Sequence, residues 1–220
     1  MPRVLVVVIY TSYKSYCRHL YPRTYDRLSY KNKFLFYVTD RFYPELLSCP
    51  TGEQVCADGR NYGILRARRG GFDYVLFLDH DLDVDPDIIQ KLLAVHHPVA
   101  CAPVAARGDA WALIGHNYKN RATLEREPLL KVDSKPVWTV DGASGAAELI
   151  ARRVFEAVDL SDYRGPDTIP GRFTADDEFL QIEIFKKFGI KPKIRMDIKT
   201  WHYDSNGYKY QVWGNVERWR

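Results

Sequence analysis

The chain has 220 residues, of which 46% are hydrophobic, and a formal net charge of +4. This length fits one compact domain with a sizeable core, and no apolar run approaches the roughly 18 to 20 residues that cross a bilayer, so no integral membrane segment is expected. The mild positive charge lies in clusters that suit solvated helix faces, or an anionic ligand for which a phosphorylated small molecule would serve as well as nucleic acid. No nucleic acid is among the partners we expect.

The four cysteines form no C-x-x-C pair, so neither a zinc knuckle nor a redox motif is indicated. The apolar segment at residues 4–10 is too short to span a membrane and lacks the small-residue cleavage site of a secretory signal. A cytoplasmic protein is the expectation.

Two apolar runs without alternation, residues 4–10 (VLVVVIY) and 33–40 (KFLFYVTD), are typical of strands covered on both faces in a parallel sheet. The segment between them has room for a short crossover helix, whose length Pro22 limits. A longer helix is expected from about Glu53 to Arg69, because two glycines follow it.

A strand at residues 73–79, a helix at 87–95 and a strand at 99–105 follow, with Pro86 suited to the helix start and Asp87 to its cap. Strand and helix thus alternate through the first half, which predicts an α/β layer fold that binds a nucleotide. Ligands of such sheets bind at the carboxyl ends of the strands. Three polar segments fall there: residues 10–12, 39–40 and 79–81.

The second half is less regular. Residues 106–137 are polar and mixed, a short strand is expected at 137–140, and residues 141–146 (DGASGA) form a small-residue loop. An amphipathic helix is expected from about residue 176 to 187, and a final strand over 191–204 leads to an aromatic tail.

The stretch YVLFLDHDLDVDPD, residues 74–87, is the most unusual, because a buried-strand pattern passes into aspartates at every second position. If the extension persisted, all five would point to one face. Two carboxylates about 6 Å apart repel by about 3 kcal/mol at an effective dielectric of about 20. Either the chain turns and spreads the charges into water, or a cation binds there.

An EF-hand is excluded because Val84 and Gln90 stand where its loop requires Gly and Glu. Asp79 and Asp81 share a face where the buried strand ends, and a metal-diphosphate role is expected for them. The three later aspartates suit turn and helix-capping positions instead: Asp83, Asp85 and Asp87.

Residues 59–89 (GRNYGILRARRGGFDYVLFLDHDLDVDPDII) resemble the nucleotide-sugar half of GT-A glycosyltransferases, in particular the large family 2 group. The shared pattern is an Arg-Asn-x-Gly helix start, a hydrophobic strand, an Asp-x-Asp motif and a proline a few residues on. The segments DGASGAAELIARRVF, TADDEF and WHYD follow in the order that this family predicts.

This resemblance implies an α/β protein with the Rossmann-like GT-A fold of nucleotide-diphospho-sugar transferases, whose mostly parallel central sheet is flanked by helices. It implies a single domain over residues 1–220. Residues 1–105 would bind the nucleotide sugar, and residues 106–220 would bind the acceptor and carry the catalytic base.

By the same resemblance, Asp81 is the direct metal ligand, Asp79 holds the ribose or a metal-bound water, and His202 completes the metal site. Oxygen ligands suit Mg²⁺ or Mn²⁺, and an imidazole ligand favours Mn²⁺. The alternative for His202 is a purely structural histidine.

The motif TADDEF implies a carboxylate general base, and Asp176, Asp177 and Glu178 are the candidates. Asp177 is preferred if Asp176 takes the place of the family's usual Glu, whereas counting back from Phe179 favours Asp176. The alternative is that the three acids only stabilise a helix N-terminus electrostatically.

For the donor, the resemblance places Thr11 and Tyr13 along the base and ribose, Asp40 on the edge of the base, and Arg60 and Asn61 near the base or phosphate. Asp40 would accept a hydrogen bond from a base N–H, which fits uracil and leaves guanine open. Aromatic faces stack on sugar rings, so three tryptophans are candidates for the acceptor side: Trp138, Trp201 and Trp213.

The expected function is therefore a metal-dependent glycosyltransferase that moves one sugar from a UDP- or GDP-sugar to a hydroxyl of a glycan, protein or small-molecule acceptor, with inversion. One alternative is a sugar-nucleotide nucleotidyltransferase, which would carry a Gly-rich basic loop where this chain has IYTSYKS. The other is a nucleotide-sugar binding module without catalysis.

Overall fold

The computed structural model describes residues 1–10, 20–39, 52–120, 125–129, 135–158 and 176–218. The helices in these residues are α1 (Leu20–Arg27), α2 (Gly52–Gly70), α3 (Ile88–Leu93), α4 (Arg152–Phe155) and α5 (Asp176–Phe188). The strands in them are β1 (Val4–Tyr10), β2 (Lys33–Thr39), β3 (Tyr74–Leu78), β4 (Leu82–Val84), β5 (Val99–Cys101), β6 (Ala105–Ala106), β7 (Asp109–Leu113), β8 (Gly115–Asn120), β9 (Glu125–Pro128), β10 (Val137–Thr139), β11 (Gly142–Ala143), β12 (Ala147–Ala151), β13 (Lys193–Arg195), β14 (Thr200–Tyr203), β15 (Tyr208–Gln211) and β16 (Asn215–Arg218).

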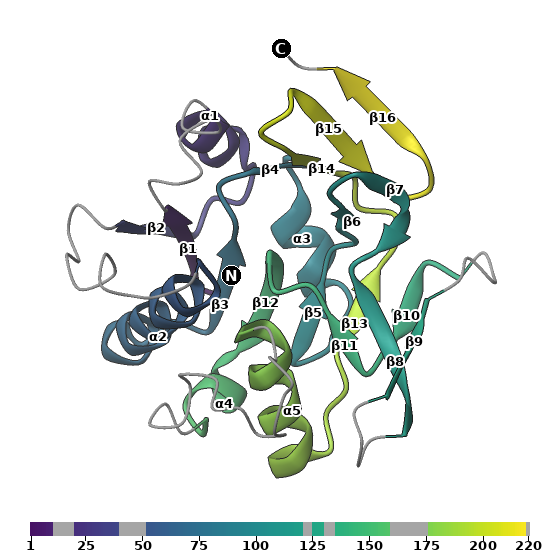
Figure 1. Cartoon of the computed structure of the whole chain (residues 1–220). Coiled ribbons are helices and arrows are strands. Elements are labelled where there is room, and N and C mark those ends of the chain that lie inside the picture. Colours follow the sequence, from purple (N-terminus) through teal and green to yellow (C-terminus); the bar gives the residue numbers. More distant parts are fainter. Residues whose placement is uncertain (11–19, 40–51, 121–124, 130–134, 159–175, 219–220) are drawn as a thin grey trace.

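A seven-stranded sheet in the order β10-β13-β5-β12-β3-β1-β2 crosses the molecule (Figure 1). β1 pairs in parallel with β2 and β3, and β13 pairs in parallel with β5. β12 lies antiparallel between β3 and β5, and β10 is antiparallel to β13. Strands β1, β2, β3, β5 and β13 therefore run in one direction, which confirms the predicted α/β fold with a mostly parallel central sheet.

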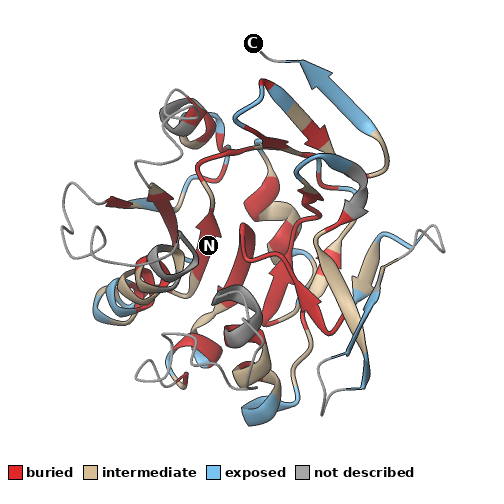
Figure 2. Ribbon diagram, in the orientation of Figure 1, coloured by how far each residue is buried: buried red, intermediate tan, exposed pale blue. Residues whose placement is uncertain are grey.

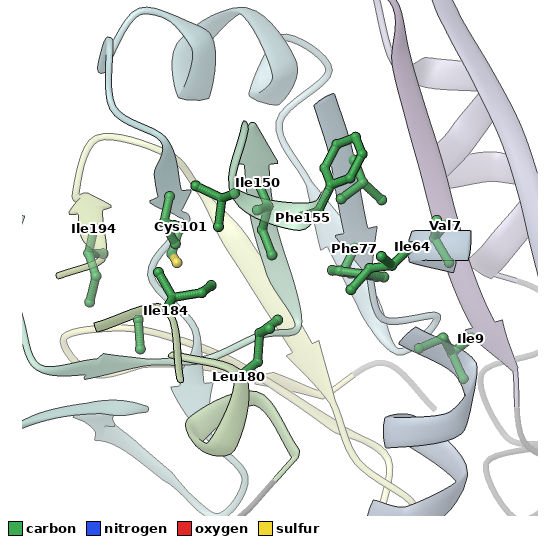
Figure 3. Close-up of a cluster of buried hydrophobic side chains, with 14 of the residues drawn as sticks. Val7, Ile9, Ile64, Phe77, Cys101, Ile150, Phe155, Leu180, Ile184 and Ile194 are labelled. Carbon is green, nitrogen blue, oxygen red and sulfur yellow. The ribbon is translucent and has the colours of Figure 1, made fainter. Parts of the chain in front are cut away.

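Alternate residues of β1 enter two hydrophobic clusters, one on each face of the sheet. Leu5, Val7 and Ile9 pack in the cluster that includes residues of α2, α4 and α5 (Figure 3). Val4, Val6 and Val8 pack in the cluster that includes the buried residues of α3. Buried residues accordingly fill the middle of the sheet in Figure 2. Because both faces are covered, β1 is apolar at every position, as the sequence predicted.

β2 departs from the prediction that it is covered on both faces. It is an edge strand of the sheet, and Phe34 and Leu35 in its first half are 42% and 38% exposed. Val38 and Thr39 at its other end are buried. An apolar run without alternation therefore fits both an interior strand such as β1 and an edge strand such as β2. The position in the sheet is decided by pairing with other strands, which the run itself does not encode.

The region predicted as polar and mixed contains antiparallel strand pairs, β6 with β7 and β8 with β9. The strand predicted over residues 99–105 ends at Cys101. The final strand predicted over residues 191–204 divides into β13, in the large sheet, and β14, in a separate four-stranded sheet with β4, β15 and β16. Because of this division, β14 pairs with β4, which is the strand that follows β3 in the chain.

Two local predictions about helices are wrong. Asp87 stands at the cap position of α3 but makes no capping hydrogen bond, because its carboxylate pairs with Lys91 at 3.0 Å instead. The Arg-Asn-x-Gly motif lies in the middle of α2 rather than at its start.

The helix predicted from residue 176 is α5, and Gly189 after it has the left-handed φ of 67° that ends helices. None of the described helices is long and apolar enough to cross a membrane.

Gly63 lets α2 approach the sheet closely. A Cβ at this position would lie 2.8 Å from Cγ1 of Val7 and 3.0 Å from Cε1 of Phe77. Both neighbours belong to buried central strands, so neither can move away without disturbing the sheet. The close approach also sets the position of Arg60, one helical turn earlier in α2.

We therefore expect Gly63→Ala to destabilise the protein, although this change in a helix interior normally gains about 0.5–1 kcal/mol. Overpacking a core costs about 1–3 kcal/mol, so the net loss in the free energy of unfolding should be about 1–2 kcal/mol, measured by urea denaturation. Arg66→Ala, at an exposed position of the same helix, is the control and should stay within about 0.5 kcal/mol of wild type. If the free energy of unfolding of Gly63→Ala equalled that of wild type, α2 would be able to shift away from the sheet without cost.

Candidate functional site

The chain turns sharply where β3 ends, so the run of aspartates does not share one face. The backbone N–H of Leu82 donates to the carbonyl oxygen of Asp79 at 3.2 Å, and β4 then continues in another sheet. The later aspartates form ion pairs near the surface: Asp83 with Arg27 at 3.0 Å, and Asp85 with Lys91 at 2.7 Å. The repulsion expected of an extended run is relieved in this way, and Asp79 and Asp81 remain at the strand end.

The carboxylate of Asp81 is fully buried, with 0% exposure. Its Oδ2 lies 3.4 Å from Nε2 of His202 and also contacts Nη2 of Arg107. The backbone N–H of Tyr203 donates to the carbonyl oxygen of Asp81 at 3.0 Å. Two segments that are distant in the sequence, β14 and the turn between β6 and β7, therefore converge on this aspartate.

His202 is placed by strand pairing and oriented by a backbone carbonyl. β14 runs antiparallel to β4, with His202 opposite Leu82, which brings its ring beside Asp81. Nδ1 lies 2.8 Å from the carbonyl oxygen of Ala105, which can only accept, so Nδ1 carries a proton. In the neutral ring, Nε2 then offers its lone pair toward Asp81. Metal-binding histidines are commonly oriented by such a contact.

Asp81 and His202 fit a divalent cation. Two neighbouring ligand atoms of an octahedral ion with bonds of about 2.1 Å lie about 3 Å apart, and Oδ2 and Nε2 are separated by 3.4 Å. Mg²⁺ and its analogues often take one or two carboxylates from the protein and complete their shell with phosphates and water. No cluster of three potential ligands occurs in the described part of the chain. The pair therefore suits a cation that arrives with a phosphate ligand.

Asp79 faces Arg60 in α2. Nη2 of Arg60 lies 3.6 Å from Oδ1 of Asp79, and the guanidinium, in a residue only 2% exposed, sits 5.7 Å from the ring centre of Phe77. The next residue, Asn61, has a buried Oδ1 without a hydrogen-bond partner among the described residues. The structure thus brings two predicted donor-binding residues, Arg60 and Asp79, into one ion pair.

His80, between the two aspartates, links the ends of β3 and β1. It is 3% exposed, its Nδ1 lies 2.9 Å from the carbonyl oxygen of Ile9, and its ring packs edge-on against Tyr10 at 4.9 Å. Sequence reasoning missed this residue because a single histidine in a charged run carries no pattern. Its contacts hold the carboxyl ends of two neighbouring parallel strands together.

The small-residue loop at 141–146 connects the end of β3 to α5. The backbone N–H of Asp79 donates to the carbonyl oxygen of Ala146 at 2.8 Å. The buried amide of Gln181 accepts from the N–H of Ala143 at 2.8 Å and donates to its carbonyl oxygen at 3.0 Å. Gln181 also donates to Oε1 of Glu148, which is 0% exposed, at 2.9 Å. Neither Gln181 nor Glu148 belonged to a predicted site.

α5 begins at Asp176, so the three candidate bases occupy its first turn. Contacts are described for Gln181, one turn further along, but not for the candidate side chains. The predicted residues that lie outside the described part of the structure are the side chains of Asp176, Asp177 and Glu178, and Thr11, Tyr13 and Asp40 entirely.

A cleft of about 410 Å³ lies beside β14 and is lined by Thr200 and by the turn between β15 and β16. Trp213 lines it with a backbone φ of 73°, a conformation that a bulky residue rarely adopts. The ring centre of Trp138 lies 6.1 Å from that of Trp213. Trp201 packs instead beneath Lys209, whose Nζ lies 4.3 Å from its ring centre. Two of the three candidate tryptophans therefore come together, and the third does not join them.

Arg107 was missed by sequence reasoning. It lies in the turn between β6 and β7, inside the region that the sequence predicted only as polar and mixed. A lone arginine before a glycine carries no functional pattern, and only strand pairing brings it to Asp81.

No protein-family model matches the sequence, and no curated protein sequence matches it. Solved structures do match. A197 from STIV aligns with a TM-score of 0.61 at 12% identity, over 99% of this chain and 94% of that one. TarS from S. aureus aligns with a TM-score of 0.54 at 12% identity, over 89% of this chain and 35% of TarS. GalNAc-T7, crystallised with UDP, GalNAc and Mn²⁺, aligns with a TM-score of 0.54 at 13% identity, over 97% of this chain and 45% of that one.

TarS and GalNAc-T7 are glycosyltransferases of the GT-A fold, so this chain has the GT-A fold. The resemblance to GT-A glycosyltransferases in the sequence is confirmed for the fold. The chain spans less than half the length of either of these two larger proteins.

The contacts of Gln181 predict that it joins α5 to the loop at 141–146. Gln181→Ala would leave the buried carboxylate of Glu148 and the backbone groups of Ala143 without these contacts. Each unsatisfied buried group costs about 1–3 kcal/mol, so we expect a loss of about 2–4 kcal/mol in the free energy of unfolding, measured by urea denaturation. Glu183→Ala on the same helix removes only a surface ion pair with Lys186 and should cost at most about 1 kcal/mol. Equal losses in both variants would contradict this role of Gln181.

Proposed function

We propose that the protein is a metal-dependent glycosyltransferase that moves a sugar from a UDP- or GDP-sugar to a hydroxyl of a glycan, protein or small molecule. The observation that carries this proposal is the pair formed by Asp81 and His202, whose Oδ2 and Nε2 lie 3.4 Å apart where β3 ends. The crystal structure of GalNAc-T7 with UDP, GalNAc and Mn²⁺ supports it, because that protein has the same fold.

In this proposal Asp81 and His202 hold Mn²⁺, or Mg²⁺, together with the donor diphosphate. The bound cation would neutralise the charge that builds on the departing nucleoside diphosphate. Arg60 orients Asp79, which receives the ribose or a metal-bound water. The buried Oδ1 of Asn61 supports a contact with the nucleotide sugar in the same region, since this oxygen accepts no hydrogen bond from the described residues.

A carboxylate in the first turn of α5 would take the proton from the acceptor hydroxyl as that oxygen attacks the anomeric carbon. Asp177 is our first choice and Asp176 the second, and direct displacement would invert the anomeric centre. The hydrogen bonds of Gln181 support this placement, because they tie the same helix to the loop that contacts Asp79. Positioning of this kind lets a general base act on a bound hydroxyl.

The cleft beside β14 supports an acceptor that contains a sugar. Thr200 lines it and lies two residues before His202 on the same strand, so β14 contributes both to the cleft and to the proposed metal pair. The rings of Trp138 and Trp213 offer apolar faces on which a sugar ring stacks.

Calorimetric titration with UDP and with GDP, each with and without Mn²⁺, tests the donor site. Wild type should bind one of them, and more tightly when Mn²⁺ is present. Asp81→Asn changes charge with little change in volume and should weaken Mn²⁺-dependent binding by about 100-fold or more, because loss of an outer-shell partner alone costs 10- to 100-fold.

Asp83→Asn is the matched control, since the same change two residues later affects only a surface pair with Arg27, and it should bind as wild type does. Wild type that binds neither nucleotide would overturn the proposal. Release of nucleoside diphosphate from a UDP- or GDP-sugar measures turnover, and nucleotide binding without turnover on any acceptor would indicate a binding module instead.

The proposed base makes a separate prediction. Asp177→Asn should lower kcat for sugar transfer by about 10²- to 10⁴-fold while leaving the affinity for UDP or GDP nearly unchanged. Asp176→Asn is the matched comparison in the same helical turn. A larger loss in Asp176→Asn would transfer the role to that residue, and an undiminished kcat in both variants would refute a base in this turn.

A further inference from the structure

Arg107 contacts the same oxygen that the proposed metal site uses. Its Nη2 contacts Oδ2 of Asp81, and Nε2 of His202 faces that oxygen at 3.4 Å. The Asp81 side chain is 0% exposed and that of Arg107 is 38% exposed. The guanidinium therefore reaches a buried carboxylate from the solvent side.

The backbone around Arg107 is anchored on both sides. Ala105, two residues earlier, accepts at its carbonyl oxygen from Nδ1 of His202. Gly108, one residue later, has a φ of 82° and a backbone hydrogen bond to the Tyr210 hydroxyl. Burial, aided by the hydrogen bond that Tyr210 donates to Asp204 at 2.8 Å, raises the pKa of Tyr210, while the Gly108 bond opposes this rise. The turn holds the arginine backbone at the site, and the long side chain reaches between carboxylate and solvent.

A buried carboxylate needs a compensating positive charge, because an ion removed from water without a partner is strongly disfavoured. Arg107 supplies this charge in the structure. A divalent cation on Oδ2 would add two further charges beside the guanidinium, and like charges at such a distance repel. The guanidinium and the cation therefore compete for Oδ2 unless an anion arrives with the cation.

The donor diphosphate is such an anion. A planar guanidinium binds phosphate oxygens through two parallel hydrogen bonds, and it does so better than an ammonium group. A diphosphate bound next to Asp81 would lie within reach of a half-exposed arginine that is anchored in the adjoining turn. The negative charge of the diphosphate would also offset the repulsion between the guanidinium and the cation.

We propose that the guanidinium of Arg107 contacts Oδ2 of Asp81 in place of the cation until the nucleotide sugar binds. The guanidinium then moves away from Asp81 and binds the diphosphate through hydrogen bonds. This inference rests on the proposed function and adds a diphosphate-binding residue that also controls metal loading. Metal alone then binds weakly, and nucleoside diphosphate and metal strengthen each other's binding. By linkage, the two ligands must strengthen each other by the same factor.

Three titrations on wild type and Arg107→Gln test this inference: Mn²⁺ alone, UDP or GDP alone, and Mn²⁺ in the presence of the nucleotide. Loss of the competing charge should tighten the binding of Mn²⁺ alone by at least about tenfold. Loss of the phosphate contact should weaken the binding of nucleotide alone by at least about tenfold. The factor by which nucleotide strengthens Mn²⁺ binding should fall accordingly. Arg66→Gln, at an exposed position of α2, is the control and should match wild type in all three.

Each outcome has a distinct meaning. If Arg107→Gln binds Mn²⁺ alone as wild type does, or more weakly, Arg107 does not compete with the cation for Asp81. If Arg107→Gln binds nucleotide as tightly as wild type, Arg107 does not contact the diphosphate. If wild type and Arg107→Gln both bind neither Mn²⁺ nor nucleotide, the proposed function fails together with this inference. If Mn²⁺ strengthens nucleotide binding in wild type but Arg107→Gln matches wild type in all three titrations, the proposed function stands and this inference fails.

Arg107→Lys keeps the test decisive if Arg107→Gln does not fold, because it retains a positive charge for Asp81. An ammonium group still competes with Mn²⁺ but cannot make the paired contact with phosphate. The Lys variant should therefore bind Mn²⁺ alone within about threefold of wild type and bind nucleotide at least about threefold more weakly. Nucleotide affinity equal to wild type would refute the contact with the diphosphate.

Discussion

The buried charge of Asp81 is the constraint on which the site depends. A carboxylate with no solvent exposure carries a desolvation penalty of several kcal/mol, and the fold must meet it with positive charge and hydrogen-bond donors. The guanidinium of Arg107 contacts the carboxylate and the ring of His202 faces it, while the N–H of Tyr203 donates to the backbone carbonyl oxygen of the same residue. These residues come from the turn after β6 and from β14, so the burial of one carboxylate is linked to the packing of two distant segments.

The scaffold around this charge is rigid where the site needs it. β3 is covered on both faces and ends at Leu78, directly before Asp79, and His80 ties that end to Ile9 of β1. The loop at 141–146 then connects Asp79 to α5 through Gln181. Side chains that are held by several buried contacts keep their geometry, which is what positions catalytic groups. The long side chain of Arg107 is the contrasting element, because it is 38% exposed and reaches the buried Asp81 from the solvent side.

The fold alone does not decide the chemistry, since one fold serves many reactions. Likeness to A197, TarS and GalNAc-T7 at 12% to 13% identity establishes the architecture. Particular atoms support the proposed sugar transfer: an oxygen and a nitrogen at ligand spacing, a histidine with its proton placed by a carbonyl, and a helix tied through Gln181 to the loop that contacts the same strand end. Arg107 adds a cation where the resemblance implied only a metal, and this makes the charge balance of the site dependent on what is bound.

The sequence by itself determined the alternation of strands and helices through β5, the placement of Asp79 and Asp81 at a strand end, and α5, because hydrophobic periodicity and glycine stops are local signals. It paired Asp81 with His202 only through resemblance to a family. Tertiary structure decided that β2 is an edge strand, that the last strand divides into β13 and β14, and that Arg107 and Gln181 reach the site. Those outcomes depend on strand pairing between residues far apart in the chain, about which the local pattern of a single sequence carries no information.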